Sequence, residues 1–143
     1  MKRSKIVVSV SIDYDGDCTF DIDIIRPDVN AHVYFYGDAD TFAAFGKALI
    51  AFPQSATDTV SFEVGQAGHP SSFGYLLINA YCASPAGHTA LKIIVDNNEE
   101  GAVHHRFEFS IPSEAAAINK LGVLLANWQM KTNPHIVWKA ETR

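Results

Sequence analysis

The chain has 143 residues, of which 48% are hydrophobic and 19% charged, and its formal net charge at pH 7 is −5. This length and composition predict one globular domain over residues 1–143, with enough apolar surface to fold without a metal or a disulfide framework. The negative charge argues against nucleic acid as a partner, because Lys and Arg must neutralise phosphates in such complexes. The apolar run from Ile6 to Ile12 is too short to span a bilayer and is not followed by a cleavage site, so we expect a cytoplasmic protein without a membrane partner.

The first third of the chain shows the period-two pattern of strands. Residues 5–12 and 17–25 alternate between apolar and polar side chains on either side of an Asp-Gly pair, which is a strong hairpin signal. A third strand is expected at 31–36. Because the second strand has one apolar and one polar face, the pattern favours an antiparallel sheet with one side in water.

The first helix is expected over residues 39–52 and should end at Pro53, which cannot continue a helix. Asp38 or Asp40 can cap its free N–H groups. The expected buried positions recur at helical spacing, and they are Phe42, Phe45, Leu49 and Phe52.

The second helix is expected over residues 113–128, with Ser113 as its N-cap. Strand patterns occupy the chain between the helices, including a long apolar run at 73–83 that is typical of a central strand. The expected order is β-β-β-α-β-β-β-α, with a possible short strand around 135–139. We therefore predict an α+β fold in which two helices pack on one face of an antiparallel sheet of about six to seven strands.

Acidic residues are concentrated in one part of the chain. Residues 11–63 carry ten acids against two bases, a net charge of −8, whereas residues 64–143 are balanced. Complementary charge steers protein association, so this stretch indicates a basic protein partner, and a solvated face that keeps the protein soluble is the alternative. The candidate binding residues are Asp15, Asp21, Asp23, Asp38 and Asp40.

The sequence contains no complete metal-binding or catalytic motif that would indicate an enzyme. The segment 13–17 has the alternating carboxylates of a calcium loop, but the required Gly is Cys18 and the required Glu is Ile24. HExxH, CxxC and Gly-x-Ser-x-Gly motifs do not occur. We therefore expect no metal, no cofactor and no catalytic residue. Cys18 and Cys82 are expected to be buried free thiols, although a bridge between strands stays open.

An alternative function is a small-molecule-binding or hydrolytic site that folding assembles from histidines. Its candidates are His69, His88 and His105, near the loop at 65–72, because loops of this kind often carry binding residues. His104 is expected to point into solvent, on the opposite face of its strand from His105.

The packing pattern across residues 33–128 resembles small bacterial domains of uncharacterised families, some of them similar to immunity proteins that neutralise toxin domains in competition between bacteria. The residues that carry this resemblance are Phe42, Phe45, Leu49, Phe52, the strand 60–63, the turn 85–88 and the strand-to-helix run 107–128. The resemblance implies a non-enzymatic binding role and transfers no functional residue. Self-association through an exposed sheet edge or face also stays open.

Overall fold

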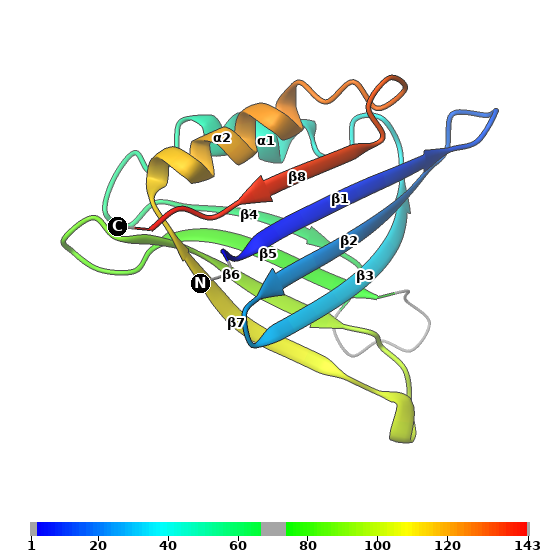
Figure 1. Ribbon diagram of the computed structural model, residues 1–143, viewed down its shortest axis with the longest axis horizontal. Coiled ribbons are helices and arrows are strands. Elements are labelled where there is room, and N and C mark those ends of the chain that lie inside the picture. Colours follow the sequence, from blue (N-terminus) through cyan, green and yellow to red (C-terminus); the bar gives the residue numbers. More distant parts are fainter. Residues whose placement is uncertain (1–2, 67–73, 143) are drawn as a thin grey trace.

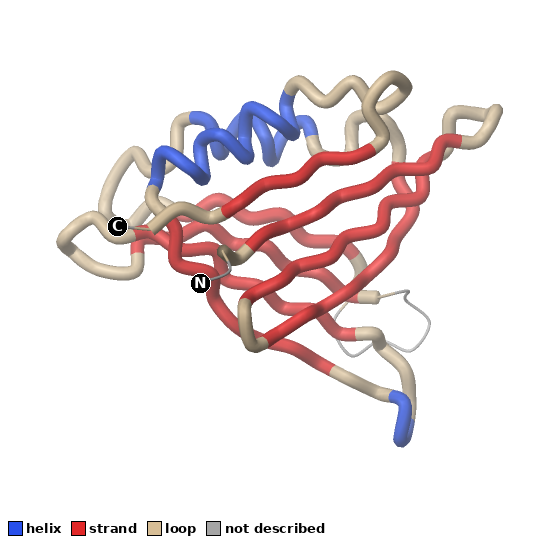
Figure 2. Tube along the Cα trace, in the orientation of Figure 1, coloured by secondary structure: helices blue, strands red, loops and turns tan. Residues whose placement is uncertain are grey.

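The computed structural model describes residues 3–66 and 74–142, and this part of the chain contains eight strands and two α-helices (Figure 1; Figure 2). All paired strands are antiparallel, so the predicted α+β class with an antiparallel sheet is confirmed. Two details differ from the expectation. The strands form two sheets of four rather than one sheet, and four strands rather than three lie between the helices.

The first sheet has the strand order β3-β2-β1-β8. It consists of β1 (Lys5–Ile12), β2 (Cys18–Arg26), β3 (Val29–Gly37) and β8 (His135–Lys139). The hairpin predicted at the Asp-Gly pair joins β1 to β2, and Gly16 adopts the positive φ of 88° that its turn requires. The short C-terminal strand exists and pairs with β1, so it completes this sheet at one edge.

The second sheet has the strand order β4-β5-β6-β7 and follows the chain as a meander. Its strands are β4 (Thr59–Val64), β5 (Tyr75–Cys82), β6 (Thr89–Asp96) and β7 (Arg106–Ser113). A 3₁₀ turn, Gly101–Val103, lies between β6 and β7. The long apolar run predicted to be a central strand is β5, which lies inside the sheet as expected.

The hydrophobic core lies between the two sheets. Alternate residues of each strand point inward, so the core contains fully buried side chains from both sheets, including Phe20, Ile22, Ile24, Leu76, Leu91 and Ile93. Arg26 links the sheets outside this core. Its guanidinium donates a hydrogen bond to the Ser110 carbonyl at 3.0 Å and lies 5.3 Å from the centroid of the Phe109 ring.

The two helices, α1 (Ala43–Ile50) and α2 (Ala115–Ala126), lie side by side next to β4 and β8 (Figure 1). They contribute to the core between the sheets, where Phe42 stacks on Phe62 of β4 with ring centroids 4.7 Å apart. The buried indole of Trp138 in β8 donates to the Ala117 carbonyl of α2 at 2.7 Å. Neither helix in the described part of the chain has the length and apolarity needed to cross a lipid bilayer.

Both capping predictions are wrong. The N-cap of α1 is Phe42 and that of α2 is Glu114, and neither makes a side-chain capping hydrogen bond. Asp38 instead accepts the Asp40 N–H and shapes the turn before α1. Ser113 belongs to β7, and its hydroxyl accepts the Glu141 N–H, so it ties the C-terminal segment to the strand end.

Candidate functional site

The outward side chains of the first sheet form a continuous exposed surface, which we call the outer face. The strand register and burial patterns define which residues belong to it. These are the odd-numbered residues of β1, β2 and β8 and the even-numbered residues of β3, which point away from the core. Two predicted binding residues lie in its middle. Asp21 pairs in register with Tyr34, and Asp23 pairs with His32. The alternation seen in the sequence therefore placed both carboxylates on this surface.

Aromatic side chains stand next to these carboxylates. Tyr34 and Tyr36 are 44% and 59% exposed, and their rings meet edge to face with centroids 6.3 Å apart. Across the strands, Nε2 of His32 lies 3.2 Å from Oδ1 of Asp21, and both side chains are half-exposed. Exposed tyrosines are enriched in protein interfaces, because a large ring and a hydroxyl serve apolar and polar contacts together.

One end of the outer face is strongly acidic. Asp13, Asp15 and Asp17 are exposed in the β1–β2 turn, and an oxygen from each lies within 4.8 Å of the others. Asp13 also accepts the N–H groups of Asp15 and Asp17, so part of its role is to shape the turn. The alternating carboxylates of residues 13–17, which resemble an incomplete calcium loop in the sequence, therefore also lie close together in the structure.

The loop after β3 extends the same acidic end. Burial raises the pKa of the Cys18 thiol, and the negative charges of Asp38 and Asp13 raise it further, which shows that the two loops converge there. Asp40 follows Asp38 in the same loop and is exposed. Of the five predicted acidic residues, Asp15, Asp38 and Asp40 therefore lie in the two loops at the acidic end, whereas Asp21 and Asp23 lie further along β2 in the middle of the outer face. Cys18 and Cys82 are both free, and they lie in different sheets.

The predicted histidine site is not assembled in the described part of the chain. His69 lies outside the described residues. His88 precedes β6 and His105 precedes β7 at the other end of the second sheet, so the eight-residue strand β6 separates them by roughly 25 Å. Nδ1 of His105 lies 3.0 Å from the Asn97 amide nitrogen. His88 lines a cleft at its own end of the sheet.

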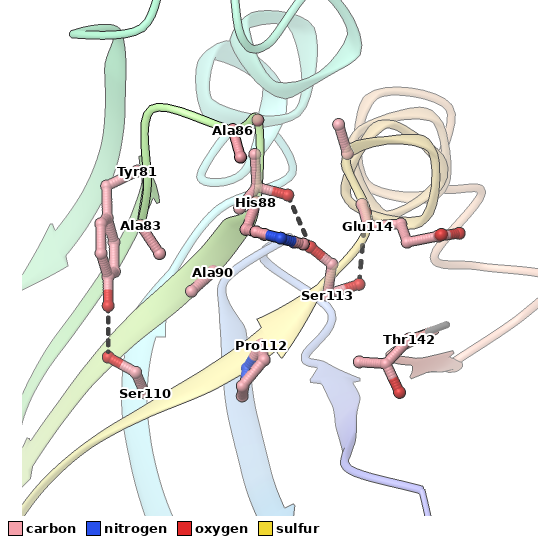
Figure 3. Close-up of a pocket in the computed structure, with 13 residues that line it drawn as sticks. Tyr81, Ala83, Ala86, His88, Ala90, Ser110, Pro112, Ser113, Glu114 and Thr142 are labelled. Atoms are coloured by element: carbon pink, nitrogen blue, oxygen red, sulfur yellow. Dashed lines mark hydrogen bonds between the residues drawn. The ribbon is translucent and has the colours of Figure 1, made fainter.

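That cleft has a volume of about 620 Å³ and lies between the β5–β6 turn, the end of β7 and the start of α2. Tyr81 and Ser110 stand on one side of it, and Glu114 and Thr142 on the other (Figure 3). The Tyr81 and Ser110 hydroxyl oxygens are 2.9 Å apart and share a hydrogen bond. Among the described residues, His88 makes no hydrogen bond to a hydroxyl of this cleft, so the cleft can bind polar groups but holds no assembled nucleophile and base.

Sequence reasoning missed a buried carboxylate at the opposite end of the second sheet. Asp96 accepts hydrogen bonds from the Asn98 N–H at 2.8 Å and from Nε2 of His104 at 2.9 Å, and an Arg106 nitrogen lies 3.5 Å away. Burial alone would raise the pKa of Asp96, but the bonds from Asn98, His104 and Arg106 outweigh it and hold the pKa below its ordinary value. The predicted exposure of His104 is confirmed, since its side chain is 43% exposed, but the sequence did not indicate that its ring also bonds to this carboxylate.

A second missed contact lies beside Asp96. The buried Tyr75 hydroxyl donates to Oε2 of Glu63 on the neighbouring strand. Burial, together with this bond and the negative charge of Glu63, raises the pKa of Tyr75 to about 12. The Asp96 cluster and the Tyr75–Glu63 hydrogen bond stabilise the same end of the second sheet. No local sequence pattern predicts either contact, because the partners lie far apart in the chain.

Comparison with protein-family models, with curated proteins and with solved structures finds no significant match for this chain. The resemblance to immunity-type domains therefore gains no support from relatives. The function has to be argued from the two surfaces described above, the outer face of the first sheet and the cleft beside His88.

Proposed function

We propose that this protein is a non-enzymatic protein-binding module that works through the outer face of the first sheet and its acidic end. The observation that carries the proposal is the adjacency of Asp21 to the exposed Tyr34, with Asp23 two residues further along β2 and Tyr36 two residues further along β3. Such a surface offers aromatic contact area, hydroxyl groups and negative charge together, which are the features a protein interface needs.

The fitting partner is a polypeptide that presents Lys and Arg. Carboxylates attract these side chains over long range and speed their encounter, while tyrosine faces hold cations by cation–π contact. An immunity-type role is one form of this proposal, in which the partner is a toxin domain with a basic surface. Each form predicts binding that weakens as salt screens the charges.

Affinity capture from a lysate of the source organism, at low and at physiological salt, tests this proposal. The baits are the wild-type chain, the pair Asp21→Asn with Asp23→Asn, and the pair Tyr34→Ser with Tyr36→Ser. The matched control is Glu99→Gln with Glu100→Gln, which makes the same charge change on exposed residues of the β6–β7 connection. We expect wild type and control to retain the same polypeptide and both outer-face variants to lose it. Capture of nothing at either salt, or equal capture by all baits, would refute the proposal.

The cleft supports a second candidate function, the binding of a small organic molecule. Its volume of about 620 Å³ lies within the usual range of ligand sites, and the Tyr81–Ser110 pair offers hydrogen bonds at one side. Screening of polar aromatic fragments by two-dimensional NMR tests this. Shifts confined to the cleft in wild type and lost in Tyr81→Ser support ligand binding, and no shift at millimolar fragment concentration excludes it.

A further inference from the structure

The end of the outer face opposite to the acidic end is basic. Lys5 of β1 and Lys139 of β8 are directly opposite in register and both point outward. With Arg3 they surround a depression of about 500 Å³ whose apolar parts are Ile25 and Pro27, and we call this surface the basic depression.

Like charges placed directly opposite each other on neighbouring strands destabilise a sheet. Within the described residues, neither Lys5 nor Lys139 has a carboxylate within 4.0 Å. The basic depression therefore carries uncompensated positive charge around an apolar floor. An anionic group that also brings an apolar side chain fits it best.

The same chain carries a segment of that chemistry at its acidic end. The β1–β2 turn, residues 13–17, which we call the hairpin tip, projects beyond the body of the molecule (Figure 1). It presents a carboxylate on each side of Tyr14, which is 98% exposed. An almost wholly exposed tyrosine between clustered carboxylates is unfavourable in an isolated chain, since the charges repel and the ring stays in water.

We propose that the hairpin tip of one copy docks in the basic depression of a second copy. This inference rests on the proposed function, because it names a second copy of the chain as the partner of the outer face. In the contact, the carboxylates of Asp15 and Asp17 meet Lys5 and Lys139, and the Tyr14 ring packs on Ile25 and Pro27.

The position of the two surfaces makes the contact reciprocal. The hairpin tip and the basic depression lie at opposite ends of the same strands, β1 and β2. A two-fold axis in the plane of the outer face and across its strands reverses the strands, so each tip lies over the other copy's depression. Such an isologous contact is the commonest form of homodimer.

The area available is adequate for a dimer of modest affinity. Four strands about 4.8 Å apart, of 8, 9, 9 and 5 residues, give roughly 500 Å² of projected surface per copy, to which the hairpin tip adds. Stable interfaces bury about 800 Å² of accessible surface per partner. The unfavourable part is the middle of the face, where Asp21 and Asp23 of the two copies approach each other. Within each copy His32 offsets part of this repulsion, because its Nε2 lies 3.2 Å from Oδ1 of Asp21.

Sedimentation equilibrium of charge-reversed chains tests the proposal. One variant, Lys5→Glu with Lys139→Glu, makes the basic depression net negative. The other, Asp15→Lys with Asp17→Lys, makes the hairpin tip net positive. Asp13 is left in place because it bonds to the backbone of the turn. We expect wild type to dimerise at about 100 µM, and each variant alone to dimerise at least about tenfold more weakly. An equimolar mixture of the two variants should dimerise again, since each tip then faces an oppositely charged depression.

Two controls separate this contact from general effects of charge and folding. Lys47→Glu with Lys131→Glu makes the same charge change on exposed residues elsewhere and should leave the dimer unchanged. Circular dichroism melting should show every variant folded. A wild-type monomer at about 100 µM, a reversed variant that still dimerises like wild type, or a mixture that stays monomeric would overturn the inference. If the wild type is a monomer yet the outer face still captures another polypeptide, the proposed function stands and the second copy is excluded as its partner.

Discussion

Gly46 of α1 and Gly122 of α2 face each other where the two helices pack together. A Cβ atom on Gly46 would lie 2.9 Å from the Gly122 carbonyl oxygen and 2.6 Å from the Ala126 nitrogen, and one on Gly122 would lie 2.7 Å from the Gly46 carbonyl oxygen. The helices therefore meet backbone to backbone, at a distance that no side chain can occupy. This contact lets both helices fit beside β4 and β8 and cover the core.

Gly46→Ala should consequently destabilise the fold, although alanine is the better helix former. The new methyl group meets backbone atoms, which can give way only if a helix moves, and overpacking of this kind costs about 1–3 kcal/mol or more. Urea unfolding measures the change. Ala48→Ser, at an exposed position of the same helix, is the control and should cost less than about 1 kcal/mol. Equal stability of the two variants would show that the helices are not in close contact.

Asp96→Asn should weaken the second sheet and change its response to acid. The substitution removes a buried carboxylate that accepts from Asn98 and His104, and we expect a loss of about 1–3 kcal/mol at pH 7. Because the pKa of Asp96 is lowered by folding, its contribution is present above the ordinary pKa near 4 and is lost as pH falls through the lower folded value.

Unfolding by urea between pH 7 and pH 2 therefore distinguishes the two chains. The gap between wild type and Asp96→Asn should narrow as the carboxyl group is protonated. A gap that stays constant down to pH 2 would mean that the Asp96 charge contributes nothing to stability.

Tyr75→Phe should alter stability at the other end of the pH scale. The folded pKa of about 12 exceeds the ordinary value of 10, so the contribution of the neutral hydroxyl is complete below pH 10 and is lost as pH rises toward 12. The loss of the bond to Glu63 should cost about 1 kcal/mol at pH 7. Melting temperatures at pH 8 and pH 11 test this, and we expect wild type to lose more than the Phe variant between them. An equal decline in both proteins would contradict the role assigned to this hydroxyl.

The sequence allowed the local elements to be predicted because alternation and helical spacing are short-range patterns. The hairpin at Gly16, the central strand β5 and both helices could be located in this way. The division into two sheets could not. It arises because β3 and β4 belong to different sheets, with α1 between them in the chain. The pairing of β8 with β1 was equally hard to predict, because it joins residues about 130 positions apart, such as Lys5 and Lys139, and no local pattern encodes that contact.

In the candidate site too, the features set by local patterns could be predicted, and those set by contacts between distant segments could not. Strand alternation placed Asp21 and Asp23 outside the core, and their neighbours in the chain gave no reason to connect them with Tyr34, which only the register of β2 and β3 brings beside them. The role of Asp96 could not be predicted, because this residue ends an apolar strand and its hydrogen bonds come from a turn whose path the sequence does not define. The N-cap of α2 could not be predicted from the sequence, because Ser113 extends β7 instead of ending the strand.

Photocrosslinking tests the central claim, that the outer face of the first sheet is a protein-docking surface, most directly. A benzophenone amino acid is introduced in place of Tyr34, on the outer face, or in place of Ser61, which is exposed on the outward side of the second sheet. After irradiation in cells of the source organism, the account predicts a discrete polypeptide product from position 34 and none from position 61. A product from position 61 alone, or none from position 34, would contradict it.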